Sequence, residues 1–209
     1  MTLANARQGG NQPRRPRVAR VLVERHTDLM SDPLAPGLLI SMPDLLDPNF
    51  HRSVVLMCMH SDEGAFGLKI NHPLDLTTAE VCSEVEIEWR GEDEQAAFSG
   101  GPVEPFRGWL LHLDDTMYDG SQAVGHGIAV SSSQEALEAY GRSPSGAFRL
   151  VLGYAGWGPG QLEREMDQGS WMTAPLSRAI LFDTTPEDIW SASLRSIGVD
   201  PLRLVGGGS

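Results

Sequence analysis

Two residues on one apolar segment, Cys58 and His60, have the types and the spacing of a thiol-based catalytic pair. They belong to the run "SVVLMCMH" (residues 53–60), whose apolar, β-branched character predicts a buried strand. Residues two apart on a strand face the same side, and an imidazolium beside a cysteine lowers the pKa of the thiol, as nucleophiles and redox sensors require. Free cysteines are more often buried and inert, which favours a packed thiol over a reactive one.

A second candidate site is the glycine-rich stretch "GYAGWGPGQLERE" (residues 153–165), which runs into a predicted helix. Unpaired backbone N–H groups at a helix N-terminus attract anions, but Pro159 lacks a donor and the pattern is neither a Walker loop nor GxGxxG. A sharp turn with Trp157 in the core is the favoured alternative. The candidate ligand-binding residues here are Gly156, Trp157, Gly158, Gly160, Gln161 and Glu163.

Gly100 and Gly101, in "GGPVE", complete the candidate ligand-binding set, because this segment could face the first glycine stretch across a cleft. The remaining histidines form no short ligand pair and no HExxH motif. The sequence therefore predicts no metal and no cofactor. His51, His72, His112 and His126 are among these scattered histidines.

The elements that must position these groups follow from apolar periodicity and from glycine and proline breakers. The run at 53–60 and "AFGLKIN" (65–71), separated by "SDEG", predict a hairpin. Further strands are expected at Leu38–Ser41, in "GWLLHL" and in "FRLVLGY". Helices are expected at Thr77–Val85, after a Ser132–Glu135 capping box as far as Gly141, from Pro159 to Gly169, and from Thr185–Pro186 to Ile197.

Strands and helices thus mix, which predicts one α+β (mixed α/β) domain over residues 33–205, with a mixed sheet and helices packed against it. Residues 1–32, rich in Arg, Pro, Gly and Gln, are predicted to be a basic, disordered tail. Residues 206–209 form a Gly-rich end.

The charge distribution limits the classes of partner. The chain of 209 residues has a net charge of −12, although six arginines make its first 32 residues basic. Nucleic-acid affinity comes largely from basic groups, so the acidic body disfavours nucleic acid. The chain has neither a membrane-length apolar run nor the apolar core of a secretory signal, so we expect a cytoplasmic protein without a membrane partner.

Several segments in order resemble the AlgH/YqgE family of small bacterial proteins: "GLLISMPDLLDPNFHRSVVLMCMH", "EGAFGLKINHP", "GGPV", "RGWLLH", "LGYAGWGPGQLERE", "SW" and "AILFD". The resemblance implies a mixed α/β domain whose sheet curls into an incomplete barrel. It also implies a family without an established activity, some members of which are named transcriptional regulators. The family usually has a glutamate where this chain has Met59.

Three functions from different classes follow. The first is a ligand-binding or regulatory protein whose cleft between the GGPV and GYAGWGPGQLE segments takes a small anionic ligand or a protein partner. The second is a hydrolase or thiol-dependent enzyme that uses Cys58 and His60, which the substitution at Met59 disfavours. The third is a transcriptional regulator, which the acidic body disfavours.

Overall fold

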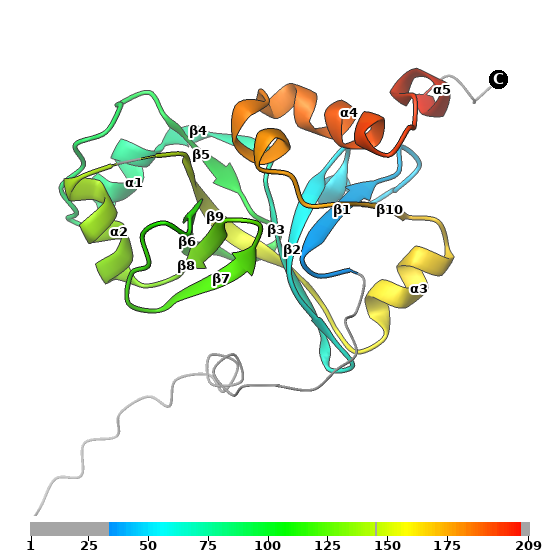
Figure 1. Cartoon of the computed structure of the whole chain (residues 1–209), viewed down its shortest axis with the longest axis horizontal. Coiled ribbons are helices and arrows are strands. Elements are labelled where there is room, and N and C mark those ends of the chain that lie inside the picture. The colour runs from blue at the N-terminus through cyan, green and yellow to red at the C-terminus, as the bar shows by residue number, and fades with distance from the viewer. Residues whose placement is uncertain (1–33, 145, 206–209) are drawn as a thin grey trace, which may run out of the picture. The chain divides into compact units, whose positions relative to one another are not determined.

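The computed structural model describes residues 34–144 and 146–205, so the predicted tail and the Gly-rich end lie outside the described residues (Figure 1).

The strands are, in chain order, β1 (Gly37–Ser41), β2 (Val54–Ser61), β3 (Gly64–Lys69), β4 (Pro73–Thr77), β5 (Ala96–Ser99), β6 (Val103–Leu113), β7 (Ser121–Gly125), β8 (Ile128–Ser131), β9 (Phe148–Trp157) and β10 (Trp171–Ala174). The helices are α1 (Thr78–Glu84), α2 (Gln134–Arg142), α3 (Gln161–Asp167), α4 (Pro186–Ser196) and α5 (Pro201–Val205), with a 3₁₀ turn at Pro48–Phe50 and a π-helix at Ala179–Asp183.

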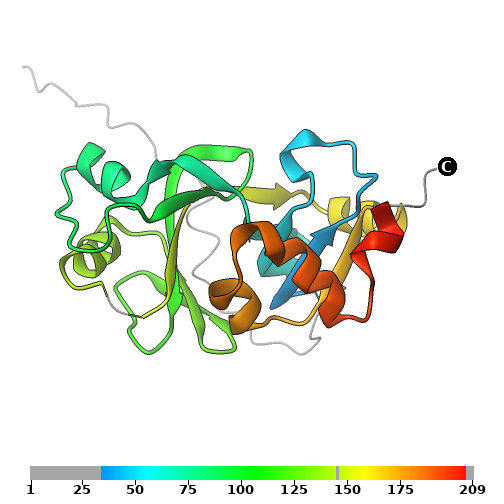
Figure 2. The ribbon, with the colours of Figure 1, turned by 90° about the horizontal axis from the view of Figure 1, so that it is seen from above.

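The strands form one large, mainly antiparallel sheet in the order β10-β1-β2-β3-β9-β6-β8-β7, with β4 and β5 attached beside this path. Strand β5 pairs in parallel with β9 and antiparallel with β4, so the sheet is mixed and the predicted α+β class is confirmed. Helices α1 and α2 lie at one end of the sheet, and α3, α4 and α5 lie at the other (Figures 1 and 2).

The expected incomplete barrel is wrong, because the sheet is neither closed nor strongly curled. A sheet closes into a barrel when its first and last strands pair with each other. Here β10 and β7 are the two end strands of the path, and they do not pair with each other.

The predicted hairpin is confirmed as β2 and β3, and β2 is buried on both faces. Leu56 belongs to the first core, which lies under α4, whereas Val55 and Met57 belong to the second core beside α3. Burial on both faces explains why this strand is a continuous apolar run rather than an alternating one. The first core includes Leu38, Ile40, Leu68, Val151, Ile189 and Leu194, and the second includes Leu39, Phe50, Trp157, Leu162 and Trp171.

All four predicted helices are present as α1, α2, α3 and α4, but the bounds of α2 and α3 differ from the prediction. Ser133, not Ser132, caps α2, because its hydroxyl accepts from the Ala136 N–H, and α2 continues past Gly141 to Arg142. Helix α3 begins at Gln161 rather than Pro159, since its N-cap Gly160 has a left-handed conformation. Among the helices of the described part, none is both long and apolar enough to cross a bilayer.

Trp157→Ala should lower the free energy of unfolding by about 3–5 kcal/mol, because it truncates a large core aromatic. The Trp157 side chain is 6% exposed and its ring lies 6.2 Å from Phe50 and 5.9 Å from Trp171 between centroids. Urea denaturation measures the change. Phe106→Ala is the control, since Phe106 is 94% exposed and surface truncations usually change stability by less than about 0.5 kcal/mol. Overlapping melts of Trp157→Ala and wild type would contradict the packing role.

Candidate functional site

Cys58 and His60 lie on opposite faces of β2, so the expectation that they share a face is wrong. The pairing of β2 with β3 shifts register between Met57 and Met59, which makes Cys58 the extra residue of a β-bulge. Cys58 packs against the first core. His60 pairs with Ala65, a residue of the second core, and residues opposite each other on paired strands share a face.

The surroundings of Cys58 are those of an inert thiol. Its Sγ donates to the Leu56 carbonyl at 3.7 Å, and burial raises the pKa of the Cys58 thiol to about 12 because an apolar environment disfavours the thiolate. Burial also raises the pKa of Cys82, which is fully enclosed in the core. Both cysteines are free thiols.

His60 instead joins the end of β2 to helix α3. Its Nε2 lies 2.6 Å from Oε1 of Glu163, and the two side chains are 5% and 49% exposed, respectively. This contact spans 103 residues of sequence, and it joins a predicted catalytic candidate to a predicted ligand-binding candidate. The catalytic role of Cys58 and His60 stays a prediction.

The glycine-rich stretch is organised around the carboxylate of Glu165. Its Oε2 accepts from the indole N–H groups of Trp157 at 3.0 Å and Trp171 at 2.9 Å, and its Oε1 accepts from Gln161 Nε2 at 2.9 Å. The Gln161 Oε1 accepts in turn from the Gly158 N–H at 3.1 Å. The stretch thus has a packing function, and the ligand-binding role of its residues Gly156, Trp157, Gly158, Gly160, Gln161 and Glu163 stays a prediction.

The two glycine segments touch each other directly. A Cβ atom on Gly100 would lie 2.2 Å from the carbonyl oxygen of Gly153, and one on Gly101 would lie 2.3 Å from that of Tyr154. Gly153 itself has φ of +75° and would place a Cβ 2.7 Å from the Gly101 carbonyl. These glycines are required because backbone packs against backbone, and side chains would separate the two strands.

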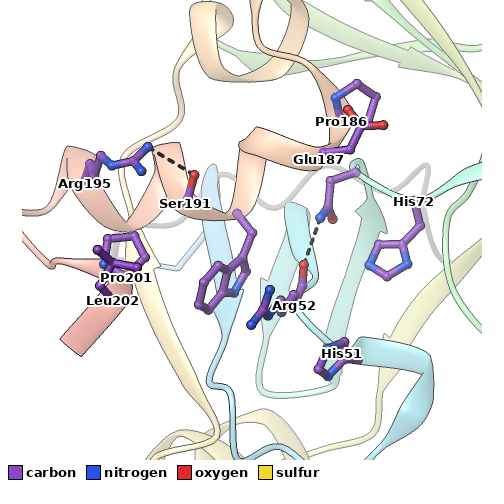
Figure 3. A pocket seen from close by; sticks show the side chains of 11 residues that line it. His51, Arg52, His72, Pro186, Glu187, Ser191, Arg195, Pro201 and Leu202 are labelled. Carbon is purple, nitrogen blue, oxygen red and sulfur yellow. Dashed lines mark hydrogen bonds between the residues drawn. The ribbon is translucent and has the colours of Figure 1, made fainter. Parts of the chain in front are cut away.

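A hollow that the sequence analysis did not find lies between the start of β2, the end of β3 and helix α4 (Figure 3). Its volume is about 490 Å³, within the range of small-molecule sites. It is lined by His51, Arg52, Asn71, His72, Pro186, Glu187, Trp190, Ser191, Arg195, Pro201 and Leu202.

Asn71 holds the turn that presents Arg52 to the hollow. Its Oδ1 accepts from the Val54 N–H and its Nδ2 donates to the Arg52 carbonyl, both at 2.8 Å. Arg52 has a left-handed backbone with φ of +46°, which is unfavourable for a side chain of this size and persists only when neighbours hold it. The amide of Asn71 supplies that restraint.

Helix α4 closes the other side of the hollow. The Trp190 indole N–H donates to the Ser41 carbonyl at 2.9 Å, and the Arg52 guanidinium carbon lies 5.4 Å from the indole centroid, within range of a cation–π contact. One turn further along, Arg195 Nη1 donates to Ser191 Oγ at 3.1 Å. Two guanidinium groups therefore border the hollow, and Glu187 is the acidic residue among the described residues that line it.

His72 is held neutral beside this hollow. Desolvation by burial, assisted by the nearby positive charge of Lys69, lowers the pKa of His72 to about 4. Its Nε2 lies 3.0 Å from the Ser53 hydroxyl. His72 thus contributes hydrogen bonding rather than charge, and the cationic character of the hollow comes from its arginines.

Comparison with known proteins gives one consistent result. The sequence model of the AlgH-like family matches residues 38–202. The UPF0301 protein of Xanthomonas campestris pv. campestris strain B100 is 45% identical over 180 residues, which cover 84% of this chain and 95% of the relative; that of Xanthomonas axonopodis pv. citri is 44% identical with the same coverage.

Solved structures extend the comparison to the fold. The solution structure of the AlgH protein from Pseudomonas aeruginosa is similar with a TM-score of 0.70 and 35% identity, over 87% of this chain and 98% of that one. A crystal structure of a protein from Corynebacterium diphtheriae has a TM-score of 0.66 at 23% identity, over 90% and 96% of the two chains, and shares the fold.

Cys58 should react slowly with iodoacetamide at neutral pH. A thiol with a pKa of about 12 carries roughly a thousandfold less thiolate at pH 7 than one with an ordinary pKa near 9. Labelling is followed by mass spectrometry in a Cys82→Ser background across pH 6–9. His60→Ala should leave the rate unchanged, because the imidazole lies on the opposite face of β2. Fast labelling below pH 7 that His60→Ala abolishes would contradict this geometry and support a thiol enzyme.

The free energy of unfolding should decrease as the pH falls from 6.5 to 4, because the folded protein keeps His72 neutral. The unfolded chain binds the proton near the ordinary histidine pKa of 6.5, whereas the folded protein resists it until about pH 4, so the contribution is present above pH 6.5 and is lost between these values. His72→Gln should flatten the decline in the free energy of unfolding between pH 6.5 and 4, as measured by urea denaturation. An unchanged slope would show that His72 accepts a proton in the folded state.

Proposed function

This chain belongs to the AlgH-like family, and we propose that it is a ligand-binding protein whose hollow beside α4 receives a small anion. The observation that carries the proposal is the pairing of Arg52 and Arg195 around one hollow in a chain of net charge −12. On an acidic surface, an arginine is expected to form an ion pair with a neighbouring carboxylate. Arg52 and Arg195 instead border the same hollow, where Glu187 is the acidic residue among the described lining residues.

The hollow combines the features of a site for an anion with an organic body. Guanidinium groups form charge-assisted hydrogen bonds with phosphate and carboxylate oxygens. Trp190 provides an aromatic wall, and Pro186, Pro201 and the 80% exposed Leu202 add apolar surface around it. Such a mixture of apolar walls and a few convergent polar groups is typical of small-molecule sites.

This location is better supported than a cleft between the two glycine segments. Gly100 and Gly101 lie in van der Waals contact with the backbone of Gly153 and Tyr154, so a ligand would have to separate paired strands. The predicted class of ligand, a small anion, is retained, and its proposed contacts move from the glycine segments to Arg52 and Arg195.

The alternative functions have weaker support. A thiol enzyme needs Cys58 as a thiolate near His60, yet the bulge in β2 puts the two side chains on opposite faces. A regulator that binds DNA needs a basic surface to neutralise phosphates, and the chain is strongly acidic.

Phenyl phosphate is a suitable probe, because its phosphate can meet the arginines while its ring packs on Trp190. Isothermal titration calorimetry should give saturable binding to wild type. The double variant Arg52→Gln/Arg195→Gln should bind at least about tenfold more weakly, since one charge-assisted hydrogen bond contributes roughly 1.5–3 kcal/mol.

The matched control is Arg107→Gln/Arg142→Gln, which removes the same charge from two arginines that pair with Glu104 and Glu138 on the surface. It should change the affinity by less than about twofold, because exposed ion pairs and distant charges contribute little. Equal weakening by both double variants would reduce the effect to net charge and exclude a built anion site beside α4.

A further inference from the structure

Arg149 is a buried cation with two of its three guanidinium nitrogens occupied by the backbone. It lies on β9 and is 5% exposed. Its Nε donates to the Leu181 carbonyl of the π-helix at 2.9 Å, and its Nη1 donates to the Ile70 carbonyl at 3.1 Å. The ring of Phe98 covers one face of the guanidinium at 4.4 Å. The Nη2 nitrogen has no hydrogen-bond partner among residues 34–144 and 146–205.

No carboxylate in the described part of the chain forms an ion pair with Arg149. A buried charge without a counter-ion is unfavourable, and such groups are normally paired. Burial lowers the pKa of Arg149 to about 10, which still leaves it charged at neutral pH. The positive charge of Arg149 is therefore available for an anion that the chain itself does not supply.

Arg149 lines a second hollow, distinct from the one beside Arg52. Its volume is about 810 Å³, and the two hollows share Pro186 as a lining residue. The second hollow has both polar and apolar walls, and Phe98, Phe148, Phe182 and Pro144 supply aromatic and proline surface. Gln95 adds an amide.

Among the described residues that line the second hollow, Arg149 is the cation without an ion pair. Arg90 also lines it, but the Nε and Nη2 of Arg90 both lie 2.9 Å from Oε1 of Glu88. Glu92 is the acidic lining residue, is exposed, and forms no ion pair with Arg149. An entering carboxylate would therefore meet one unneutralised guanidinium beside the aromatic side chains of the hollow.

We propose that this hollow is a binding site for a small carboxylate with an aromatic or apolar body. The carboxylate accepts from Nη2 of Arg149, the edge of the guanidinium that the backbone carbonyls and Phe98 leave unused. The body of the ligand packs against Phe148, Phe182 and Pro144. The site is separate from the anion site beside α4, because its charge comes from a different arginine and Pro186 is the one described residue that lines both hollows.

Benzoate is the probe, and benzamide is its neutral analogue of the same shape. Titration calorimetry on the full chain should show saturable benzoate binding at concentrations up to about 10 mM, the range expected for so small a ligand. Benzamide should bind at least about tenfold more weakly, because it cannot form a charge-assisted hydrogen bond with Arg149.

Two variants locate the site by different means. Arg149→Met removes the charge at similar length, and Ala147→Phe fills the hollow from a half-buried lining position while leaving Arg149 intact. Each should weaken benzoate binding at least about tenfold. If Arg149→Met fails to fold, Ala147→Phe decides the question alone.

The controls are Arg107→Gln, which removes a cation that pairs with Glu104 and lines neither hollow, and the double variant Arg52→Gln/Arg195→Gln; both should keep benzoate affinity within about twofold of wild type. The proposal is overturned if benzoate does not bind wild type at 10 mM, or if Ala147→Phe binds it as wild type does. Loss of benzoate binding in the Arg52/Arg195 double variant would also overturn it, by assigning the carboxylate to the hollow beside α4.

Discussion

The sheet depends on the close approach of residues 100–101 to the backbone of β9. Strand β9 pairs with β3 near its end and with β5 and β6 near its start, so it joins the two parts of the sheet. The Gly100 N–H donates to the Leu152 carbonyl at 2.7 Å, and a Cβ on either glycine would collide with the Gly153–Tyr154 backbone. Gly100 and Gly101 lose more backbone entropy on folding than other residues would. The close backbone packing against β9, which a side chain at either position would prevent, offsets that cost.

The same constraint arranges the groups around the two hollows. Arg149 lies in the first half of β9, where β5 and β6 flank it, and its guanidinium reaches the π-helix that precedes α4. Helix α4 in turn packs on β1, β2 and β10 and carries Trp190 to the hollow beside Arg52. The path of β9 and the placement of α4 are therefore linked through one buried side chain, and Pro186 at the start of α4 borders both hollows.

Local patterns in the sequence predicted the longer strands and four helices, but they missed β4, β5, β7, β10 and α5 and predicted the sites poorly. The β2–β3 hairpin and the Pro186 start of α4 follow from apolar runs and from proline at the first helical position. The bulge at Cys58 has no signal in the residue types, yet it reverses the side of His60. The hollow beside α4 needs side chains that are more than a hundred residues apart, such as Arg52 and Arg195, and the second hollow needs residues as far apart as Arg90 and Pro186. Polar residues at strand ends, in "HRS" and "NHP", were the available signal for the first of them.

The central position of β9 also has a consequence for the order in which the chain can fold during synthesis. Strands β3, β5 and β6 all hydrogen-bond to β9, yet all three leave the ribosome well before residues 148–157 do. Until then their apolar faces and unpaired edges are exposed, which is the state in which nascent chains bind chaperones or associate with one another. Non-local pairing of this kind also slows folding, because loops must close before contacts form. The nascent chain is therefore most vulnerable between the emergence of β6 and the emergence of β9.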